Sequence, residues 1–332
     1  MLVSWNSTNQ CNMFCDHCYR DAGARLADEL TTDEAKKLIR EIKSAGFKIM
    51  IFSGGESVMR SDIFELGSYA TEVGLRAVLG TNGTLITEEV AKKLKEAGFM
   101  AAGVSLDSLD SQKNDRFRKL ENAHDLAIQG MLNLKKAGLS FQIHTTVMDW
   151  NVDELEDITD FAIEIGAVGH HVFFLVPTGR GVNIEDEALR KVEYEKTITR
   201  LMKKQTEVKI EIKPTCAPQF MRIAGQKNIP VRFSRGCLAG ISYCIINPKG
   251  DVQPCAYLDI PVGNVKEKPF DEIWRDSKLF KELRTMEYGG KCGDCNFIDT
   301  CGGCRARAYY YSNGDYMAED NWCLYKPRGT SK

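Results

Sequence analysis

Long parts of this sequence lack cysteine, although the protein as a whole is rich in it. None of the twelve cysteines falls between residues 19 and 215. An excess of one charge sign is also missing, because the net charge is −2, and a nucleic-acid partner is therefore not expected. No apolar run reaches the length of a membrane span, and the start, "MLVSWNSTNQ", lacks the charged and apolar segments of a signal peptide. These absences predict a cytoplasmic protein without a membrane partner.

The cysteines that are present fall into two groups. Three lie at positions 11, 15 and 18, and the other nine lie between 216 and 323. In a cytoplasmic chain such groups favour metal binding over disulfides. The length of 332 residues accommodates a large domain and a smaller one, and we predict a division into residues 1–213 and 214–332.

The first group, in "TNQCNMFCDHCYRDAG", has three thiols within eight positions: Cys11, Cys15 and Cys18. Structural zinc takes four protein ligands, and an iron–sulfur cubane also has four corners. Three thiolates on a cubane leave one iron without a protein ligand, and that iron can bind a substrate or cofactor. The spacing therefore suggests a reactive cluster. Three unrelated cysteines, or a zinc site completed by His17, remain as alternatives.

Between the two groups, β-rich apolar runs alternate with amphipathic stretches. Six such units predict a parallel sheet with right-handed crossovers, either doubly wound or barrel-like, and six are too few for a complete eight-stranded barrel. The predicted strands are 2–5, 48–55, 76–83, 100–108, 140–147 and 170–177, and the predicted helices between them are 31–46, 61–74, 87–98, 123–138 and 152–166. In both architectures chemistry gathers at the C-terminal ends of the strands. The cysteine triplet, "SGGE", "TNG" and "SLDS" all lie at such ends.

The triplet and the "GGE" stretch together resemble the signature of radical S-adenosylmethionine (SAM) enzymes, although Ser57 stands where proline is usual. The resemblance implies an incomplete (β/α)6 barrel of the TIM type. It also implies a [4Fe–4S] cluster on the triplet, SAM bound to the open iron, and cleavage of SAM to a 5′-deoxyadenosyl radical. The family pattern suggests these contacts with SAM: Gly54 and Gly55 at close backbone approach, Glu56 near the amino group, Ser105 and Asp107 at the ribose, and His17 near the adenine. Glu56 would otherwise be an acid at a helix N-terminus, and Ser105 and Asp107 part of a strand-end turn.

The C-terminal cysteines resemble the SPASM extension of radical SAM enzymes over roughly residues 235 to 325. This resemblance implies one or two auxiliary [4Fe–4S] clusters. The family pattern assigns Cys237, Cys244, Cys255 and Cys304 to one cluster and Cys292, Cys295, Cys301 and Cys323 to the other. Two residues separate Cys301 from Cys304 where three are usual, which leaves a single auxiliary cluster open. Zinc is the alternative, because C-x-x-C pairs also suit zinc.

Cys216, in "KPTCAP", is left over. The usual fate of such a residue is a buried, inert thiol. Its place between the two predicted domains also makes it a candidate catalytic residue, as a proton or hydrogen donor, or a further metal ligand.

Three stretches, "CDHCYRDAG", "PTGRG" and "KPTCAP", resemble the radical SAM proteins of d-type haem and sirohaem-dependent haem synthesis. We therefore expect removal of carboxylate side chains from a sirohaem-derived tetrapyrrole such as didecarboxysirohaem. Arg20, Arg180 and Arg222 are candidate partners for its carboxylates. The first predicted strand begins at residue 2, which leaves no separate peptide-binding domain before it. The resemblance implies an anaerobic enzyme with a flavodoxin- or ferredoxin-type electron donor. The alternatives are a peptide-modifying SPASM enzyme and a non-catalytic iron–sulfur electron-transfer or scaffold protein.

Overall fold

The computed structural model, which describes residues 1–327, contains one curved sheet of ten strands in the order β10-β9-β8-β1-β2-β3-β4-β5-β6-β7. From β1 to β7 each neighbouring pair is parallel. The strands are β1 Leu2–Asn6, β2 Ile49–Ser53, β3 Arg76–Thr81, β4 Ala101–Ser105, β5 Ser140–Val147, β6 Gly169–Phe174, β7 Glu211–Thr215, β8 Tyr243–Ile246, β9 Asp251–Gln253 and β10 Gly263–Asn264.

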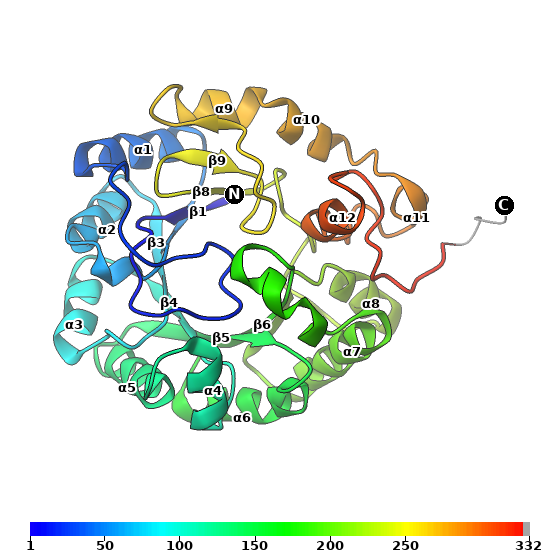
Figure 1. Ribbon diagram of the computed structural model, residues 1–332, viewed down its shortest axis with the longest axis horizontal. Coiled ribbons are helices and arrows are strands. Elements are labelled where there is room, and N and C mark those ends of the chain that lie inside the picture. The colour runs from blue at the N-terminus through cyan, green and yellow to red at the C-terminus, as the bar shows by residue number, and fades with distance from the viewer. Residues whose placement is uncertain (328–332) are drawn as a thin grey trace.

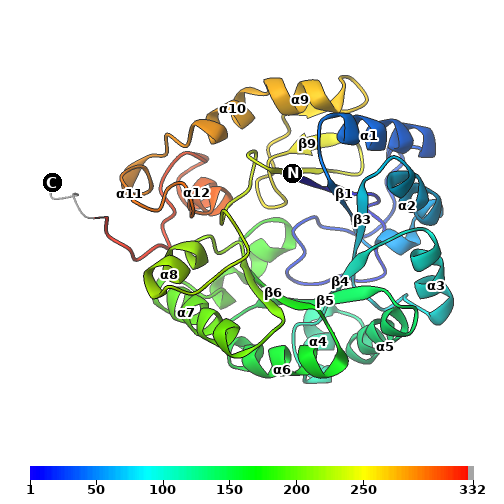
Figure 2. The same cartoon turned by 180° about the vertical axis from the view of Figure 1, so that it is seen from behind.

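Helices surround the outside of this curved sheet (Figure 1), and the view from behind shows the same ring (Figure 2). The α-helices are α1 Thr32–Ser44, α2 Ile63–Glu72, α3 Glu88–Glu96, α4 Ser111–Arg118, α5 Ala123–Lys136, α6 Leu155–Ile165, α7 Lys191–Glu207, α8 Gln219–Lys227, α9 Phe270–Asp276, α10 Lys278–Thr285, α11 Gly290–Gly293 and α12 Arg305–Tyr311. Three 3-10 helices are η1 Ser57–Met59, η2 Val152–Glu154 and η3 Gly179–Glu187. None of the helices in residues 1–327 combines the length and apolar character needed to cross a bilayer.

The first helix shows how local sequence sets the boundaries. Thr31 and Glu34 form a reciprocal capping box at the start of α1. Leu38 and Ile42 on the buried face then join the core under the sheet. The helix therefore begins where its backbone N–H groups find side-chain acceptors and packs through one apolar stripe.

The two faces of the sheet differ in exposure. Along β2 and β5 buried residues alternate with half-buried ones. The buried set, which includes Met50 and Phe52, belongs to the core beneath the helices. The half-buried set, which includes His144, therefore faces the inside of the curve, because successive side chains of a strand point to opposite faces. The concave face is partly exposed, with Ile49, Ile51 and Ser53 on β2 and the polar residues Gln142, His144 and Thr146 on β5.

The six predicted strands are all present, and the partial barrel is confirmed. The sequence prediction missed β7, which follows β6 in the sheet, and α7. It also missed the pairing of β8 with β1 in parallel, which makes the C-terminal segment a continuation of the barrel sheet. The strand β7 spans the expected boundary between residues 213 and 214. The two-domain division stays a prediction.

Candidate functional site

The loop after β1 holds the N-terminal triplet (Cys11, Cys15 and Cys18). Cys15 is buried against Met13 and Ala123, and the other two thiols are half-buried beside it. Backbone hydrogen bonds from Cys11 N to Gly23 O (2.9 Å) and from Cys18 N to Cys15 O (3.3 Å) fix the loop. Burial, together with the negative charge of neighbouring groups such as the other two thiols of the triplet, raises the pKa of the Cys15 thiol to about 11. The structure thus brings the three thiols together in a partly desolvated loop.

A positive charge that was not expected from the sequence pattern lies beside this triplet. Burial raises the pKa of both Cys11 and Cys15, and the Arg118 guanidinium opposes this rise. Arg118 lies 2.7 Å from the Asp107 carboxylate. Asp107 is fully buried and also accepts a hydrogen bond from Thr146 N at 2.7 Å. Its carboxylate orients Arg118 toward the thiols. The contact of Asp107 with a ribose, which the family pattern suggests, stays a prediction. In the structure Asp107 pairs with Arg118.

The "SGGE" loop lies directly against the loop that leads to the triplet. A Cβ on Gly54, whose φ is +153°, would come within 2.5 Å of Thr8 O. A Cβ on Gly55 would overlap the carbonyl of Gln10 and lie 2.7 Å from Asn9 O. Backbone bonds from Gly55 N to Thr8 O and from Glu56 N to Gln10 O join the two loops. The close approach that these glycines allow is therefore first of all an approach to the chain's own backbone.

Glu56 is completely buried and already has partners. Its carboxylate accepts hydrogen bonds from Thr81 Oγ1 (2.8 Å) and Asn82 N (2.7 Å), and it caps η1 through Val58 N (3.4 Å). Burial raises its pKa to about 7, and these hydrogen bonds oppose the rise. A carboxylate has about four acceptor positions, so one remains for a further donor such as an ammonium group.

His17 and Ser105 are the other two residues expected around SAM. The His17 ring stacks on Phe117 with centroids 4.3 Å apart, and burial lowers its pKa to about 4. Its Nδ1 is buried without a hydrogen-bond partner among residues 1–327. A neutral ring held flat beside the triplet suits packing on another flat group. Ser105 ends β4 and is half-buried on the concave face, level with His144 of β5.

The arginines proposed as carboxylate partners are mostly engaged within the chain. Arg180 donates to Cys15 O (2.9 Å), Ala22 O (3.0 Å) and Asp21 (2.8 Å), so it holds the triplet loop in place. Arg222 pairs with Glu195 at 2.8 Å. Arg20 donates to Gln253, while its Nε is buried without a partner in the described chain. Arg20 and Arg222 each keep a buried Nε without a hydrogen-bond partner in the described chain.

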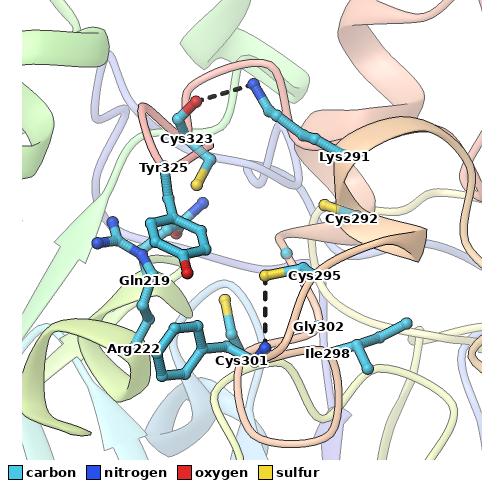
Figure 3. Close-up of a pocket in the computed structure, with 12 residues that line it drawn as sticks. Gln219, Arg222, Lys291, Cys292, Cys295, Ile298, Cys301, Gly302, Cys323 and Tyr325 are labelled. Atoms are coloured by element: carbon cyan, nitrogen blue, oxygen red, sulfur yellow. Dashed lines mark hydrogen bonds between the residues drawn. The ribbon is translucent and has the colours of Figure 1, made fainter. Parts of the chain in front are cut away.

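Four C-terminal cysteines line one pocket (Figure 3). This pocket quartet consists of Cys292, Cys295, Cys301 and Cys323. Lys291 and Arg222 also line the pocket, and Lys291 donates to Cys323 O at 2.8 Å. The grouping matches the expected ligand set of one auxiliary cluster, and two basic side chains at its edge suit the negative charge of four thiolates.

The other expected set is not assembled as predicted. Cys255 and Cys304 meet in a small apolar cluster, and Cys237 is close enough to raise the pKa of both. Cys244 lies elsewhere, in the core beneath the helices, because it occupies the outward-facing side of β8. Cys216 lies with the three instead.

The donor sets fit iron–sulfur clusters better than single ions. Within residues 1–327 no three Cys, His, Asp or Glu side chains converge on one point as the ligands of a single ion do. A cubane binds each thiolate through a different iron, so its ligands surround a volume and do not meet. The thiols of the pocket quartet surround a pocket in this way.

A partial barrel with a thiol triplet at the end of its first strand, continued by a cysteine-rich segment, defines an iron–sulfur enzyme of the barrel class. Residues 5–162 match the model of the radical SAM superfamily, and residues 237–304 match that of the SPASM iron–sulfur cluster-binding domain. The chain belongs to the radical SAM superfamily, in the group that carries a SPASM domain.

The relatives and solved structures agree with this membership. An AdoMet-dependent heme synthase from Nitratidesulfovibrio vulgaris is 42% identical, over 98% of this chain and 93% of the relative. An Fe-coproporphyrin III synthase from Methanosarcina barkeri is 32% identical, over 97% of this chain and 87% of the relative. The crystal structure of Streptococcus suis SuiB bound to the precursor peptide SuiA has a TM-score of 0.77 at 18% identity, over 98% of this chain and 76% of that one. This last likeness concerns the fold.

Family membership makes the protein an enzyme and brings its cofactors: SAM, a [4Fe–4S] cluster that binds it, and auxiliary iron–sulfur clusters. The triplet is the residue set that would hold the first cluster. When bound, this cluster and SAM supply a 5′-deoxyadenosyl radical, which takes hydrogen from a substrate. The chain's own part is to place the thiols, to hold Arg118 and His17 beside them, and to keep the two loops in contact.

Proposed function

We propose that the enzyme removes carboxylate groups from the side chains of an iron tetrapyrrole in haem biosynthesis. The observation that carries the proposal is the 42% identity, along almost the whole chain, to a protein named as a heme synthase. The relative named as an Fe-coproporphyrin III synthase is more distant, at 32%. The step that forms haem is therefore favoured over the step expected from the sequence, which acts on didecarboxysirohaem.

The chemistry required by this step can be stated from the substrate. Haem carries vinyl groups where iron coproporphyrin III carries two of its propionates. Each conversion removes one hydrogen atom, carbon dioxide and one electron. The hydrogen leaves to 5′-deoxyadenosine, and the electron needs an acceptor such as an oxidised iron–sulfur cluster. In a radical SAM enzyme with auxiliary clusters, the 5′-deoxyadenosyl radical can take the hydrogen and an auxiliary cluster can take the electron.

The concave face of the sheet offers groups suited to a carboxylated iron tetrapyrrole. Lys213, His171 and His144 lie side by side on β7, β6 and β5, level with Ser105 at the end of β4. The two histidine rings stack with centroids 5.2 Å apart, and His171 binds Glu211 at 3.1 Å. The His144 Nε2 is buried without a hydrogen-bond partner in the described chain.

This row supplies one cation and one imidazole nitrogen without a partner. Burial lowers the pKa of both histidines, which favours their neutral form, and burial also lowers the pKa of Lys213. A neutral imidazole nitrogen can accept or donate a hydrogen bond or ligate iron. In this proposal Lys213 pairs with a propionate and His144 contacts the tetrapyrrole.

Anaerobic incubation of reconstituted protein with SAM, a reductant and each tetrapyrrole in turn tests the proposal. With iron coproporphyrin III we expect the mass to fall by the elements of formic acid for each side chain converted. With didecarboxysirohaem we expect no change. Loss of an acetate side chain from didecarboxysirohaem alone would restore the original expectation. No change in either tetrapyrrole, with a peptide modified instead, would move the function to the peptide-modifying alternative.

A further inference from the structure

Cys216 lies outside both segments that match known families, which cover residues 5–162 and 237–304. It follows β7 and has a φ of +58°, in the left-handed region that residues other than glycine seldom adopt. Such a conformation costs about 1 kcal/mol or more and persists where the surroundings enforce it. The backbone at this point therefore serves to aim the side chain.

A buried ion pair holds this backbone. The Arg307 guanidinium donates twice to Cys216 O, at 3.2 and 2.6 Å, and pairs with Asp320 at 3.2 Å. Both charged side chains are fully buried. Asp320 also accepts from Cys304 N at 2.8 Å. One network thus fixes Cys216 and Cys304 relative to each other, across 88 residues of sequence.

The thiol of Cys216 lies among three others, which we call the auxiliary trio: Cys237, Cys255 and Cys304. Cys216, Cys255 and Cys304 pack in the same apolar cluster. Cys237 N donates to Cys301 O at 3.1 Å, which holds Cys237 beside the segment that leads to Cys304. The chain before Cys237 also touches the chain after Cys216, because a Cβ on Gly236 would come within 2.6 Å of Pro218 O.

Cys244 does not share this environment. It is fully buried on β8, opposite Val3, in the apolar core that includes Phe280 and Leu283. Successive side chains of a strand point to opposite faces, so the neighbouring Tyr243 points to the other side of the sheet. Cys255 and Cys304 lie in a separate apolar cluster, which does not include Cys244. The sheet therefore lies between the Cys244 thiol and the auxiliary trio.

We propose that Cys216, and not Cys244, is the fourth thiolate of the auxiliary [4Fe–4S] site formed with the auxiliary trio. Cys244 is then an apolar core residue. The buried Arg307, which donates to Cys216 O, places a positive charge at this site, and a positive charge suits bound thiolates. The site joins the end of the last parallel barrel strand to the C-terminal segment. The inference does not depend on which substrate the enzyme takes, because cluster content is measured without substrate.

The test compares matched variants of the full-length chain: Cys216→Ala, Cys216→Ser, Cys244→Ala and Cys244→Val. Each protein is reconstituted anaerobically with iron and sulfide and desalted. Iron and sulfide per chain are then counted, and electron paramagnetic resonance spectra are recorded after reduction and after mild oxidation. Unfolding temperatures of the apo proteins verify that each variant folds.

We expect Cys216→Ala to lose about four irons per chain, or about one if a three-iron cluster remains that appears on mild oxidation. Cys216→Ser keeps the side-chain size and should change the spectrum of the reduced site. If the alanine variant does not fold, the serine variant tests whether Cys216 is a ligand. Both Cys244 variants should keep the wild-type iron content and spectrum. Loss of iron in the Cys244 variants, alone or together with the Cys216 variants, would overturn the proposal. So would wild-type iron and spectra in both Cys216 variants.

Discussion

Replacing Gly55 with alanine should destabilise the protein even when no cofactor is present. The added Cβ would overlap the Gln10 carbonyl and approach Asn9 O to 2.7 Å, and both are backbone atoms that cannot rotate away. Overpacking of this kind costs about 1 to 3 kcal/mol. For 332 residues each kcal/mol lowers the unfolding temperature by about 1.4 °C, so we expect a fall of about 1.4 to 4 °C. The displaced loop carries Cys11, so reconstituted iron should fall as well.

Gly23→Ala is the matched control in the same loop region. Its Cβ would meet Phe14 at 3.6 Å, which is ordinary van der Waals contact, so its unfolding temperature should be unchanged or slightly raised. Calorimetry of the apo proteins and iron analysis of the reconstituted ones give both quantities. The reasoning is refuted if Gly55→Ala leaves the apo unfolding temperature unchanged and weakens only SAM binding. In that case the glycine serves the ligand and not the contact between the two loops.

Further predictions concern the triplet, the iron content, Glu56 and Arg180. Changing the N-terminal triplet to alanine should abolish 5′-deoxyadenosine formation and leave auxiliary iron in place; continued SAM cleavage would contradict the assignment. The wild-type protein should bind more than about four irons per chain, whereas about four irons with zinc in the remaining sites would defeat the auxiliary clusters. Because burial raises the Glu56 pKa to about 7, the contribution of Glu56 to the free energy of unfolding is present at low pH and is lost as pH rises from about 4.5 through 7. Denaturant unfolding of apo Glu56→Gln should therefore show a flatter fall in stability over this range, and an unchanged slope would refute the burial argument. Arg180→Ala should cost about 1 to 3 kcal/mol and reduce iron retention, while the exposed Arg190→Ala should do neither; equal behaviour of the two would show that Arg180 does not hold the loop.

The sequence predicted the barrel well because its signals are local. Each of the first six strands is a short apolar run bounded by polar or glycine residues, and the intervening helices have caps and apolar stripes that can be read within one segment. The strand β7, with the sequence "EIKPT", contains a lysine and a proline and follows a long helix, so local pattern did not reveal it. In β7 the side chains of Lys213 and Thr215 point to the concave face. This arrangement depends on tertiary packing, which the strand propensity of a short segment does not indicate.

The sequence predicted the type of site but not all of the residues that form it. The spacing of the triplet and the order of the C-terminal cysteines follow from the chain, and the pocket quartet is grouped as the family pattern suggests. Arg118 and Arg307 were missed because each acts through a fold contact with a distant acid or carbonyl. The placement of Cys244 depends on which side of β8 faces the helices, and that was fixed only when β8 paired with β1. Cys216 could be grouped with the auxiliary trio only once the structure showed β7, which Cys216 directly follows.

The most direct test of the account asks where the hydrogen taken by the radical comes from. Iron coproporphyrin III deuterated on its propionate carbons is incubated anaerobically with the reconstituted protein, SAM and a reductant, and the 5′-deoxyadenosine formed is analysed by mass spectrometry. The account predicts deuterium in 5′-deoxyadenosine, in proportion to the vinyl groups formed. Deuterium-free 5′-deoxyadenosine together with an unchanged tetrapyrrole would contradict it.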